Sequence, residues 1–435
     1  MEKERMILGE GCFYSMDCNE TGLNNNIIVC GGSGSGKTMS ISEPRLLETK
    51  TSSLVATVTK RRIVKKYQPL FKERGYEILD LNYVNPLESN CAYDPLEYVE
   101  SYYDITFLAE SIVKADPHKE KSNADPYWDK AAISLLSALI AYILMTKENA
   151  TFVDVLKLLD SLEVDNQGET IRTSLDSRFE YIASKKPGCF AVSCYKSFSC
   201  LPARTAGCVY GTLNTTIDTI FTPDLRKMLV KKKKIDFKKM ASKKTILFVT
   251  TSAVNPTLNC FINMFYAQIF KQLFEYAEQC PNGMLPVPVH VLCDDFATGS
   301  RILNFTEYIS IFREKRISVT LLLQSESQLE QMYGSGNATT IINNCDSYIY
   351  LGGMDLKTAQ NMSLRLNRPL EDILYMPIGQ EVVIRRGQRP IITRRYDIQK
   401  NELYQEITKE YNRQLKAAER ERTNRNLSTL KEDEK

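Results

Sequence analysis

A segment near the amino terminus has the residue types and spacing of a phosphate-binding loop. Residues 31–38 read Gly-Gly-Ser-Gly-Ser-Gly-Lys-Thr, which satisfies the pattern G-x-x-x-x-G-K-[ST]. Its glycines let consecutive backbone N–H groups turn toward phosphate oxygens, and the amino end of a following helix adds positive potential. We expect Lys37 to reach the β- and γ-phosphates of a nucleotide and the Thr38 hydroxyl to ligate magnesium. The predicted phosphate-binding residues are Gly31, Gly32, Ser33, Gly34, Ser35, Gly36, Lys37 and Thr38.

The context of this segment favours the same interpretation. The apolar run Ile27–Cys30 before it is typical of a buried strand, and a helical stretch follows it. The alternative is a flexible Gly/Ser loop with an incidental lysine. A phosphate-binding loop requires a strand before it and a helix after it, so the loop is predicted to bind a nucleoside triphosphate.

Two adjacent carboxylates are the expected partners of the loop. The apolar strand Val289–Cys293 ends in Asp294 and Asp295. We expect Asp294 to face magnesium and Asp295 to polarise the attacking water. Two carboxylates after a strand could instead cap a loop, but the presence of Lys37 favours the magnesium site. Asp295 is one methylene shorter than a glutamate, which predicts weaker or geometrically different activation of water.

Gln324 ends the next strand, Ser318–Leu323, beside the other two strand ends. Ligands of open parallel sheets bind at the carboxyl ends of strands, so Gln324 is placed to sense the γ-phosphate. An ordinary polar residue at a strand exit explains it equally well. Arg313 and Arg316 precede the same strand, and in a ring one of them could reach a neighbour's nucleotide. A solvated helix face is the favoured alternative for these arginines.

Two basic patches could contact a polyanion without reading its sequence. The net charge is only +3, so such binding must come from local patches. Charge runs are more often solvated faces, and no motif for base-specific reading is present. The candidate DNA-contacting residues are Lys60, Arg61, Arg62, Lys231, Lys232, Lys233 and Lys234.

The order of predicted elements indicates an α/β fold with a mostly parallel sheet that is interrupted by a helical insertion. The predicted units are a first part of a nucleotide-binding domain (1–99), an all-α unit (100–245), the second part of the nucleotide-binding domain (246–400) and a charged helical tail (401–435). Strands are expected at 27–30, 54–58, 76–81, 245–250, 289–293, 318–323, 347–351 and 381–384. Helices are expected at 61–74, 104–114, 129–147, 152–162, 171–184, 224–240 and 259–278.

Composition excludes several other classes of protein. With 435 residues and 43% hydrophobic content, the chain is globular and too long for one ordinary core. Its 12 cysteines lack the close pairs of zinc sites, so we expect reduced cytosolic thiols. No secretory signal is predicted, and the longest apolar run (131–145) is shorter than the ~20 residues of a membrane span. That run is predicted to be a buried core helix.

Beyond the loop, the chain resembles the TraG/TraD-type coupling proteins of conjugation systems. The resemblance runs in order from about residue 8 to residue 397. Its segments are Thr21-Gly-Leu-Asn-Asn-Asn26 before the loop, Tyr93-Asp-Pro-Leu96, Asp125-Pro-Tyr-Trp128-Asp129, Leu285-Pro-Val-Pro-Val289 leading to the acidic pair and Phe296-Ala297, Arg316-Ile-Ser-Val, Gln324-Ser, and Asn344-Cys-Asp346 leading to Tyr350-Leu-Gly-Gly353.

The resemblance implies a RecA-like P-loop ATPase domain interrupted by an all-α domain that recognises substrate. It further implies ATP and Mg²⁺ as cofactors, and a homohexameric ring at the cytoplasmic mouth of a type IV secretion channel, peripheral to the inner face of the bacterial cell membrane. Its partners would be channel components and a relaxase–single-stranded DNA or protein substrate, transferred by ATP hydrolysis.

Three departures from the family pattern leave a second function open. Relatives usually carry transmembrane helices before the loop, whereas about thirty polar residues precede it here. We therefore expect that the anchor is absent, lies on another chain or was removed. Val58-Thr59-Lys60-Arg61 replaces the usual Asp-Pro-Lys-Gly, and the acidic pair is Asp-Asp instead of Asp-Glu. The alternative is therefore an ATP-binding but slow or inactive substrate-docking adaptor. A small-molecule kinase or GTPase is disfavoured by the long helical insertion and the absence of an Asn-Lys-x-Asp motif.

Overall fold

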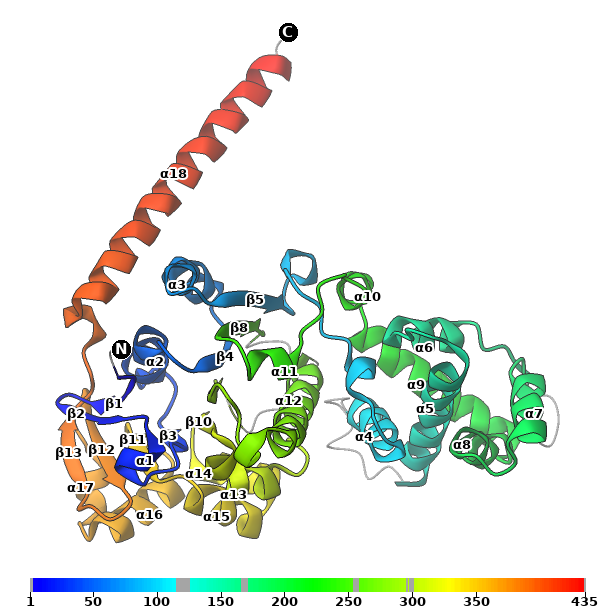
Figure 1. Cartoon of the computed structure of the whole chain (residues 1–435), viewed down its shortest axis with the longest axis horizontal. Helices are drawn as coiled ribbons and strands as arrows, with labels where there is room; N and C mark the ends of the chain where they lie inside the picture. The colour runs from blue at the N-terminus through cyan, green and yellow to red at the C-terminus, as the bar shows by residue number, and fades with distance from the viewer. Residues whose placement is uncertain are drawn as a thin grey trace.

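The computed structural model describes residues 3–114, 126–165, 171–252, 258–294, 296 and 301–433, and its centre is a nine-stranded sheet (Figure 1). The strand order is β13-β12-β11-β3-β10-β9-β4-β8-β5. All neighbouring strands from β11 to β5 pair in parallel, whereas β12 and β13 add an antiparallel edge. The strands are β3 (Ile27–Cys30), β4 (Ser53–Val58), β5 (Glu77–Asn82), β8 (Thr245–Thr250), β9 (Val289–Cys293), β10 (Ile317–Leu323), β11 (Ser347–Tyr350), β12 (Gln380–Arg385) and β13 (Ile391–Arg394). The predicted α/β class is confirmed.

Both faces of the sheet are covered, which is why most positions of its central strands are apolar. Ile27 and Val29 of β3 belong to one apolar cluster, and Ile28 and Cys30 belong to another. The first cluster packs under α2 (Glu43–Glu48) and α3 (Arg61–Glu73), and the second packs under α12 (Asn259–Gln279) and α13 (Phe305–Lys315). A parallel sheet buried on both sides gives continuous apolar runs instead of alternation, and such runs are what the sequence shows.

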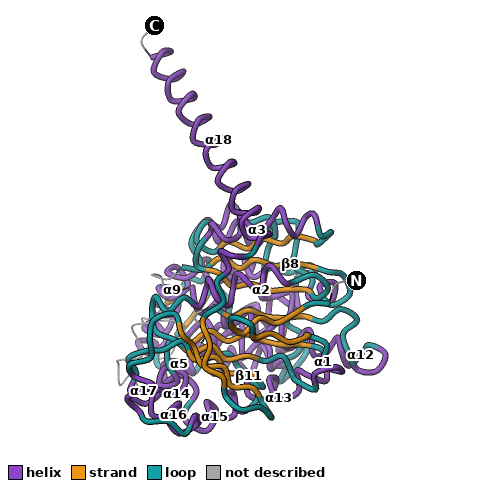
Figure 2. Tube along the Cα trace, turned by 90° about the vertical axis from the view of Figure 1, so that its left-hand side faces the viewer, coloured by secondary structure: helices purple, strands orange, loops and turns teal. Residues whose placement is uncertain are grey.

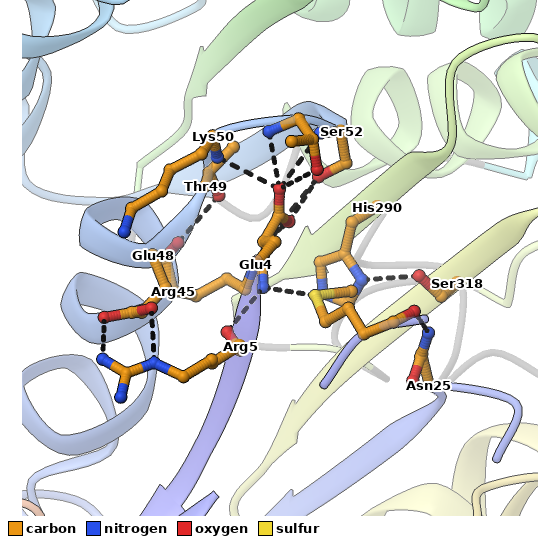
Figure 3. Close-up of polar contacts among 12 residues, drawn as sticks. Glu4, Arg5, Asn25, Arg45, Glu48, Thr49, Lys50, Ser52, His290 and Ser318 are labelled. Atoms are coloured by element: carbon orange, nitrogen blue, oxygen red, sulfur yellow. Dashed lines mark hydrogen bonds and ion pairs between the residues drawn. The ribbon is translucent and has the colours of Figure 1, made fainter. Parts of the chain in front are cut away.

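An amino-terminal hairpin, which was not among the predicted strands, is fixed to the sheet domain by a buried carboxylate. The hairpin consists of β1 (Arg5–Gly9) and β2 (Cys12–Ser15), followed by the short α1 (Cys18–Thr21). Just before it, Glu4 pairs with the guanidinium of Arg45 in α2, and both side chains are almost fully buried (Figure 3). Glu4 also accepts the backbone N–H groups of Lys50, Thr51 and Ser52 at 3.0, 2.8 and 3.0 Å. The charge of Glu4 is therefore satisfied from several sides.

Between β5 and β8 the described chain is helical apart from the two-residue strands β6 (Val164–Asp165) and β7 (Arg172–Thr173). The prediction of a helix from residue 171 was wrong at its start, because 172–173 pair with β6. The predicted helix at 224–240 is two short helices, and two helices after residue 189 were not predicted. The helices are α4 (Tyr102–Val113), α5 (Pro126–Thr146), α6 (Phe152–Asp160), α7 (Asp176–Lys185), α8 (Phe190–Ser199), α9 (Ala203–Ile220), α10 (Pro223–Leu229) and α11 (Phe237–Met240).

Helix α5 carries the apolar run of the sequence. Within the described residues it is the one helix long and apolar enough to cross a membrane, but 56% of that window is buried inside the protein. It packs against α4, α6, α8 and α9. The run therefore forms the centre of a helical core, as predicted.

The two segments that connect the sheet to the helical unit, one after β5 and one before β8, form hydrogen bonds to each other. Ala92 of the first crossing accepts the N–H of Ile235 at 3.0 Å and donates to the carbonyl of Lys233 at 2.7 Å. Next to it, the fully buried Asp94 accepts the N–H groups of Leu96 and Phe152, and so caps the first turn of α6. Burial raises the pKa of Asp94 to about 6. These contacts fix the base of the helical unit.

The remaining helices come after β10 in the chain, and the last of them projects away from the sheet domain. These helices are α14 (Glu326–Tyr333), α15 (Ser335–Asn343), α16 (Leu356–Leu366), α17 (Leu370–Leu374) and α18 (Glu402–Asp433). Only the first two turns of α18 pack on the sheet domain, through Leu403, Tyr404 and Ile407. Figure 2 shows the rest of α18 projecting from the domain.

Candidate functional site

The predicted phosphate loop connects β3 to the helix that precedes α2. Its first two residues are tied to neighbouring strands, because Gly31 N–H donates to the Leu323 carbonyl at 3.1 Å and Gly32 N–H to the Gly352 carbonyl at 3.0 Å. Gly34 and Gly36 have φ of +73° and +87°, a region that other residues rarely adopt. A π-helical turn (Thr38–Ser42) then leads into α2. The glycines thus occupy positions where the backbone conformation requires them.

Lys37 reaches back over this loop. Its ammonium donates to the carbonyl oxygens of Gly31 and Gly32 at 2.5 and 3.2 Å. The lysine therefore lies across the concave side of the loop, where phosphate oxygens would replace the two carbonyls as its partners. Thr38 begins the helical turn directly after it. This arrangement can hold a polyphosphate.

The strand order brings the predicted acidic partner to the same edge of the sheet. Strand β10 lies between β3 and β9, and Leu323 pairs with Cys30 while Leu321 pairs with Cys293. Adjacent strands are about 4.8 Å apart, so β3 and β9 are separated by about 10 Å. Lys37 and Asp294 therefore follow strands that end at the same side of the sheet. Asp294 is half-buried, and Asp295 lies outside the described residues.

The donor set fits magnesium held partly by a nucleotide. Among the described residues no group of three or more His, Cys, Asp or Glu side chains could hold a metal alone. Thr38, at the start of the turn after the loop, and Asp294, after β9, carry the hard oxygen atoms that suit a magnesium ion that keeps waters and phosphate oxygens. Gln324 is exposed and directly follows β10, the strand between β3 and β9.

The two predicted trans arginines precede β10 and so lie at the amino ends of the parallel strands, whereas the phosphate loop lies at their carboxyl ends. Arg313 is in the last turn of α13, and Arg316 ends that helix with a φ of +60°. Arg316 Nη1 donates to the carbonyls of Leu285 and Pro286 at 3.1 and 3.2 Å. Neither arginine can serve the loop of its own chain, and Arg316 is already engaged in holding the segment that enters β9.

Several lysines and arginines of the two basic patches are engaged within the chain. Arg61 binds both carboxylate oxygens of Asp80, at 2.5 and 2.6 Å. Lys231 donates to the carbonyls of Leu87 and Ser89, and Lys234 pairs with Glu97. Lys233 lies 3.7 Å from Glu77. The patch residues that are exposed are Lys60, Arg62, Lys232 and Lys233.

A buried acid near the loop was not predicted from the sequence. Glu381 of β12 is 0% exposed, and neither carboxyl oxygen has a hydrogen-bond partner among the described residues. Its space is provided by Gly9, because a Cβ on Gly9 would stand 2.1 Å from Glu381 Oε1. Burial raises the pKa of Glu381 to about 8, although Arg395 opposes this rise. In sequence, the glutamate only begins the apolar run of a strand, which gives no sign of its burial.

Glu381→Gln is expected to make the chain more stable than the wild type at high pH. Because the folded pKa lies above the ordinary value of 4.5, the contribution of the neutral carboxyl is complete below pH 4.5 and is lost as the pH rises through about 8. The glutamine resembles the neutral form, so urea unfolding at pH 8.5 should show a gain of roughly 4 kcal/mol that shrinks below about 1 kcal/mol at pH 5. Glu371→Gln, at an exposed site on α17, should show no such trend. An equal gain at both pH values would mean that the carboxyl does not titrate.

Comparison with known proteins gives one family and several solved structures. Residues 2–368 match the family described as Type IV secretory system Conjugative DNA transfer. The bacterial conjugative coupling protein TrwBdeltaN70, in its unbound monoclinic form, has a TM-score of 0.65 at 16% identity, over 91% of this chain and 89% of that one. No curated protein sequence matches the chain.

Two further structures show the same fold. The plasmid coupling protein TrwB in complex with the ATP analogue ADPNP has a TM-score of 0.63 at 16% identity, over 91% of this chain and 90% of that one. VirB4 of Thermoanaerobacter pseudethanolicus has a TM-score of 0.52 at 11% identity, over 91% and 97%. At these identities the matches establish a shared architecture, a large mostly parallel sheet with a phosphate loop after a central strand.

Proposed function

Because the chain belongs to the family of coupling proteins that serve conjugative DNA transfer in type IV secretory systems, we propose that it hydrolyses ATP to drive a DNA or protein substrate into such a channel. The observation that carries the proposal is the common edge of three adjacent strands. Strand β3 leads into the phosphate loop, β9 ends at Asp294 and β10 ends at Gln324.

The residues of these strand ends and the neighbouring Asp295 would have the following roles. Lys37 would neutralise the β- and γ-phosphates, and Thr38 with Asp294 would hold Mg²⁺, which supplies charge stabilisation at the transferred phosphoryl group. Asp295 would orient and polarise the attacking water, and Gln324 would sense the γ-phosphate. The structure of TrwB with ADP and Mg²⁺ has the same fold and supports ATP and Mg²⁺ as the cofactors.

The arginine that completes the site would come from a second copy of the chain in a homohexameric ring. Arg313 is the better candidate, since the guanidinium of Arg316 is bonded to two carbonyls of its own chain. An arginine at the opposite sheet edge can act only on a neighbour's nucleotide, so an assembled ring would be the active form.

We propose a separate role for each of the four segments of the chain. Residues 1–99 and 246–400 would form the nucleotide-binding domain, 100–245 the substrate-recognition domain and 401–435 a helical tail. The ring would lie in the cytoplasm at the inner face of the membrane, anchored through channel components, and would receive a relaxase–single-stranded DNA substrate. The exposed Lys60, Arg62, Lys232 and Lys233 would contact the DNA backbone.

ATP hydrolysis with and without single-stranded DNA tests the proposal. We expect magnesium-dependent turnover that single-stranded DNA stimulates. Asp295→Asn should bind ATP within about threefold of wild type but hydrolyse it at least ~100-fold more slowly, because general-base catalysis contributes on the order of 10²–10⁴. Asp372→Asn, an exposed acid on α17, should leave both unchanged.

One outcome would favour the adaptor instead. The acidic pair contains the shorter aspartate, which supports an ATP-binding but slow or inactive docking protein. If wild-type turnover does not exceed that of Lys37→Ala while nucleotide still binds, the motor proposal is wrong and the adaptor stands.

A further inference from the structure

An arginine from the antiparallel edge of the sheet reaches the phosphate loop within one chain. Arg395 directly follows β13, and its backbone N–H donates to the Gly379 carbonyl at 2.9 Å. Its Nη2 donates to the Leu351 carbonyl at 2.7 Å, next to the Gly352 carbonyl that accepts Gly32 N–H. Its Nη1 lies 3.5 Å from the position that a Cβ of Gly36 would occupy. The guanidinium therefore rests against the loop residue that precedes Lys37.

The guanidinium of Arg395 has N–H groups that make no hydrogen bond to the described residues. Its Nε is buried without a hydrogen-bond partner, and Nη1 makes no hydrogen bond to any described residue. No carboxylate of the described chain lies within ion-pair distance of Arg395. A charged guanidinium that is partly desolvated and only partly bonded is costly unless an anion completes its shell.

The one carboxyl group that acts on Arg395 electrostatically does not supply that anion. It is Glu381, whose pKa is raised to about 8 by burial, so it is largely neutral at pH 7. The cation of Arg395 thus stands uncompensated beside a loop built to receive negative charge. Arg395 also lies beyond residues 2–368, so the family match does not assign it a role.

We propose that Arg395 is a phosphate-binding residue of the nucleotide site that acts within its own chain. A guanidinium presents planar paired donors that match phosphate oxygens, and the donors that Arg395 leaves unused are available for this purpose. The inference rests on the proposed function, because it assumes that residues 31–38 bind a polyphosphate. It adds a cis arginine to the site, distinct from the trans arginine of a neighbouring subunit.

Arg395→Ala and Arg395→Gln are the variants that test the proposal, with Arg394→Ala as the matched control. Arg394 is the neighbouring arginine, exposed on the same strand. The probes are Mg·ATP and Mg·tripolyphosphate, the second of which has neither base nor ribose, and affinity is measured by isothermal titration. Both Arg395 variants should bind each probe about tenfold or more weakly, since a charge-assisted contact is lost. Arg394→Ala should bind within about twofold of wild type.

The salt dependence separates a phosphate contact from a structural role. Arg395→Gln keeps a donor for the Leu351 carbonyl but loses the charge. If Arg395 contacts phosphate, wild-type affinity for tripolyphosphate should fall more steeply with NaCl than that of Arg395→Gln. Parallel salt curves would mean that Arg395 only supports the loop, and the inference would be overturned.

The remaining outcomes are equally decisive. Loss of ATP affinity without loss of tripolyphosphate affinity would place the contact on the base or ribose and contradict the phosphate assignment. Wild-type affinity in both Arg395 variants, with binding lost in Lys37→Ala, would refute the inference alone. If Lys37→Ala also binds normally, the nucleotide site itself and the proposed function fail.

Discussion

Lys37→Ala is expected to weaken Mg·ATP binding at least ~100-fold and to reduce turnover to background. The ammonium of Lys37 lies across the concave side of the loop and donates to the carbonyl oxygens of Gly31 and Gly32. Removing a preorganised cation from developing phosphate charge costs on the order of 10²–10³ in rate, because water must reorganise to replace it. Isothermal titration with a non-hydrolysable ATP analogue, together with a phosphate-release assay, measures both effects.

A second lysine at the same sheet edge provides the control for this variant. Lys60 follows β4 and is exposed, so Lys60→Ala removes one positive charge without removing the predicted phosphate contact. It should keep nucleotide affinity within about twofold. Thermal unfolding in the absence of nucleotide shows whether Lys37→Ala has disturbed the empty loop. Normal affinity and turnover in Lys37→Ala would show that residues 31–38 are not the phosphate site.

Glu4→Ala is expected to lower the free energy of unfolding by about 3–5 kcal/mol. The carboxylate pairs with the buried Arg45 and also accepts the backbone N–H groups of residues 50–52. Removing one partner of a buried ion pair leaves the other charge desolvated without compensation, which is among the most destabilising changes in a protein. Urea unfolding followed by far-ultraviolet circular dichroism measures the loss.

Two comparisons isolate the contribution of burial to this effect. Lys3→Ala breaks the exposed pair with Glu20 and should change the free energy of unfolding very little, because water screens this pair. The double variant Glu4→Gln/Arg45→Met removes both charges and should recover part of the stability, since an uncharged pair has no desolvation penalty. A loss in Glu4→Ala as small as that in Lys3→Ala would mean that the carboxylate does not anchor the hairpin.

The centre of the sheet could be predicted from the sequence because both of its faces are covered. Strands such as β9 and β10 are apolar at nearly every position, and a short apolar run between turn signals has few other interpretations. The edge strand β13 and the separate amino-terminal hairpin offered no such signal. Ile391 and Ile392 of β13 are roughly 40% exposed, and β1 and β2 are short and contain polar residues. Strands at an edge are specified by their neighbours more than by their own residues.

Helix α9 was missed because threonine is a poor helix former. The hydroxyls of Thr215, Thr216 and Thr219 each donate to the carbonyl four residues earlier, at 2.8–3.0 Å, which satisfies polar groups that would otherwise favour other conformations. The apolar stripe of Val209, Leu213 and Ile217 decides the outcome through packing. Propensity alone could not show this.

The candidate site divides in the same way. Spacing predicted the loop, and the strand order explains how Asp294 comes to the same edge although it lies more than two hundred residues away. Charge alone did not distinguish Arg61, whose partner is Asp80, from the exposed Arg62 beside it. Arg395 and Glu381 carry no motif, because their importance arises only from where β12 and β13 place them.

The attachment of α18 has a mechanical consequence. The ring centroid of Tyr404, in the first turn of α18, lies 4.2 Å from the ammonium of Lys66. Lys66 in turn pairs with Glu43 at the start of α2, the helix that continues from the phosphate loop. A helix of 32 residues is about 48 Å long at 1.5 Å per residue. At that length a tilt of roughly 5° at the root displaces the far end by about 4 Å. Through Lys66 and Glu43, the first turn of α18 is therefore connected to the start of α2, directly after the phosphate loop. A small change in the orientation of that turn would be amplified along the projecting helix.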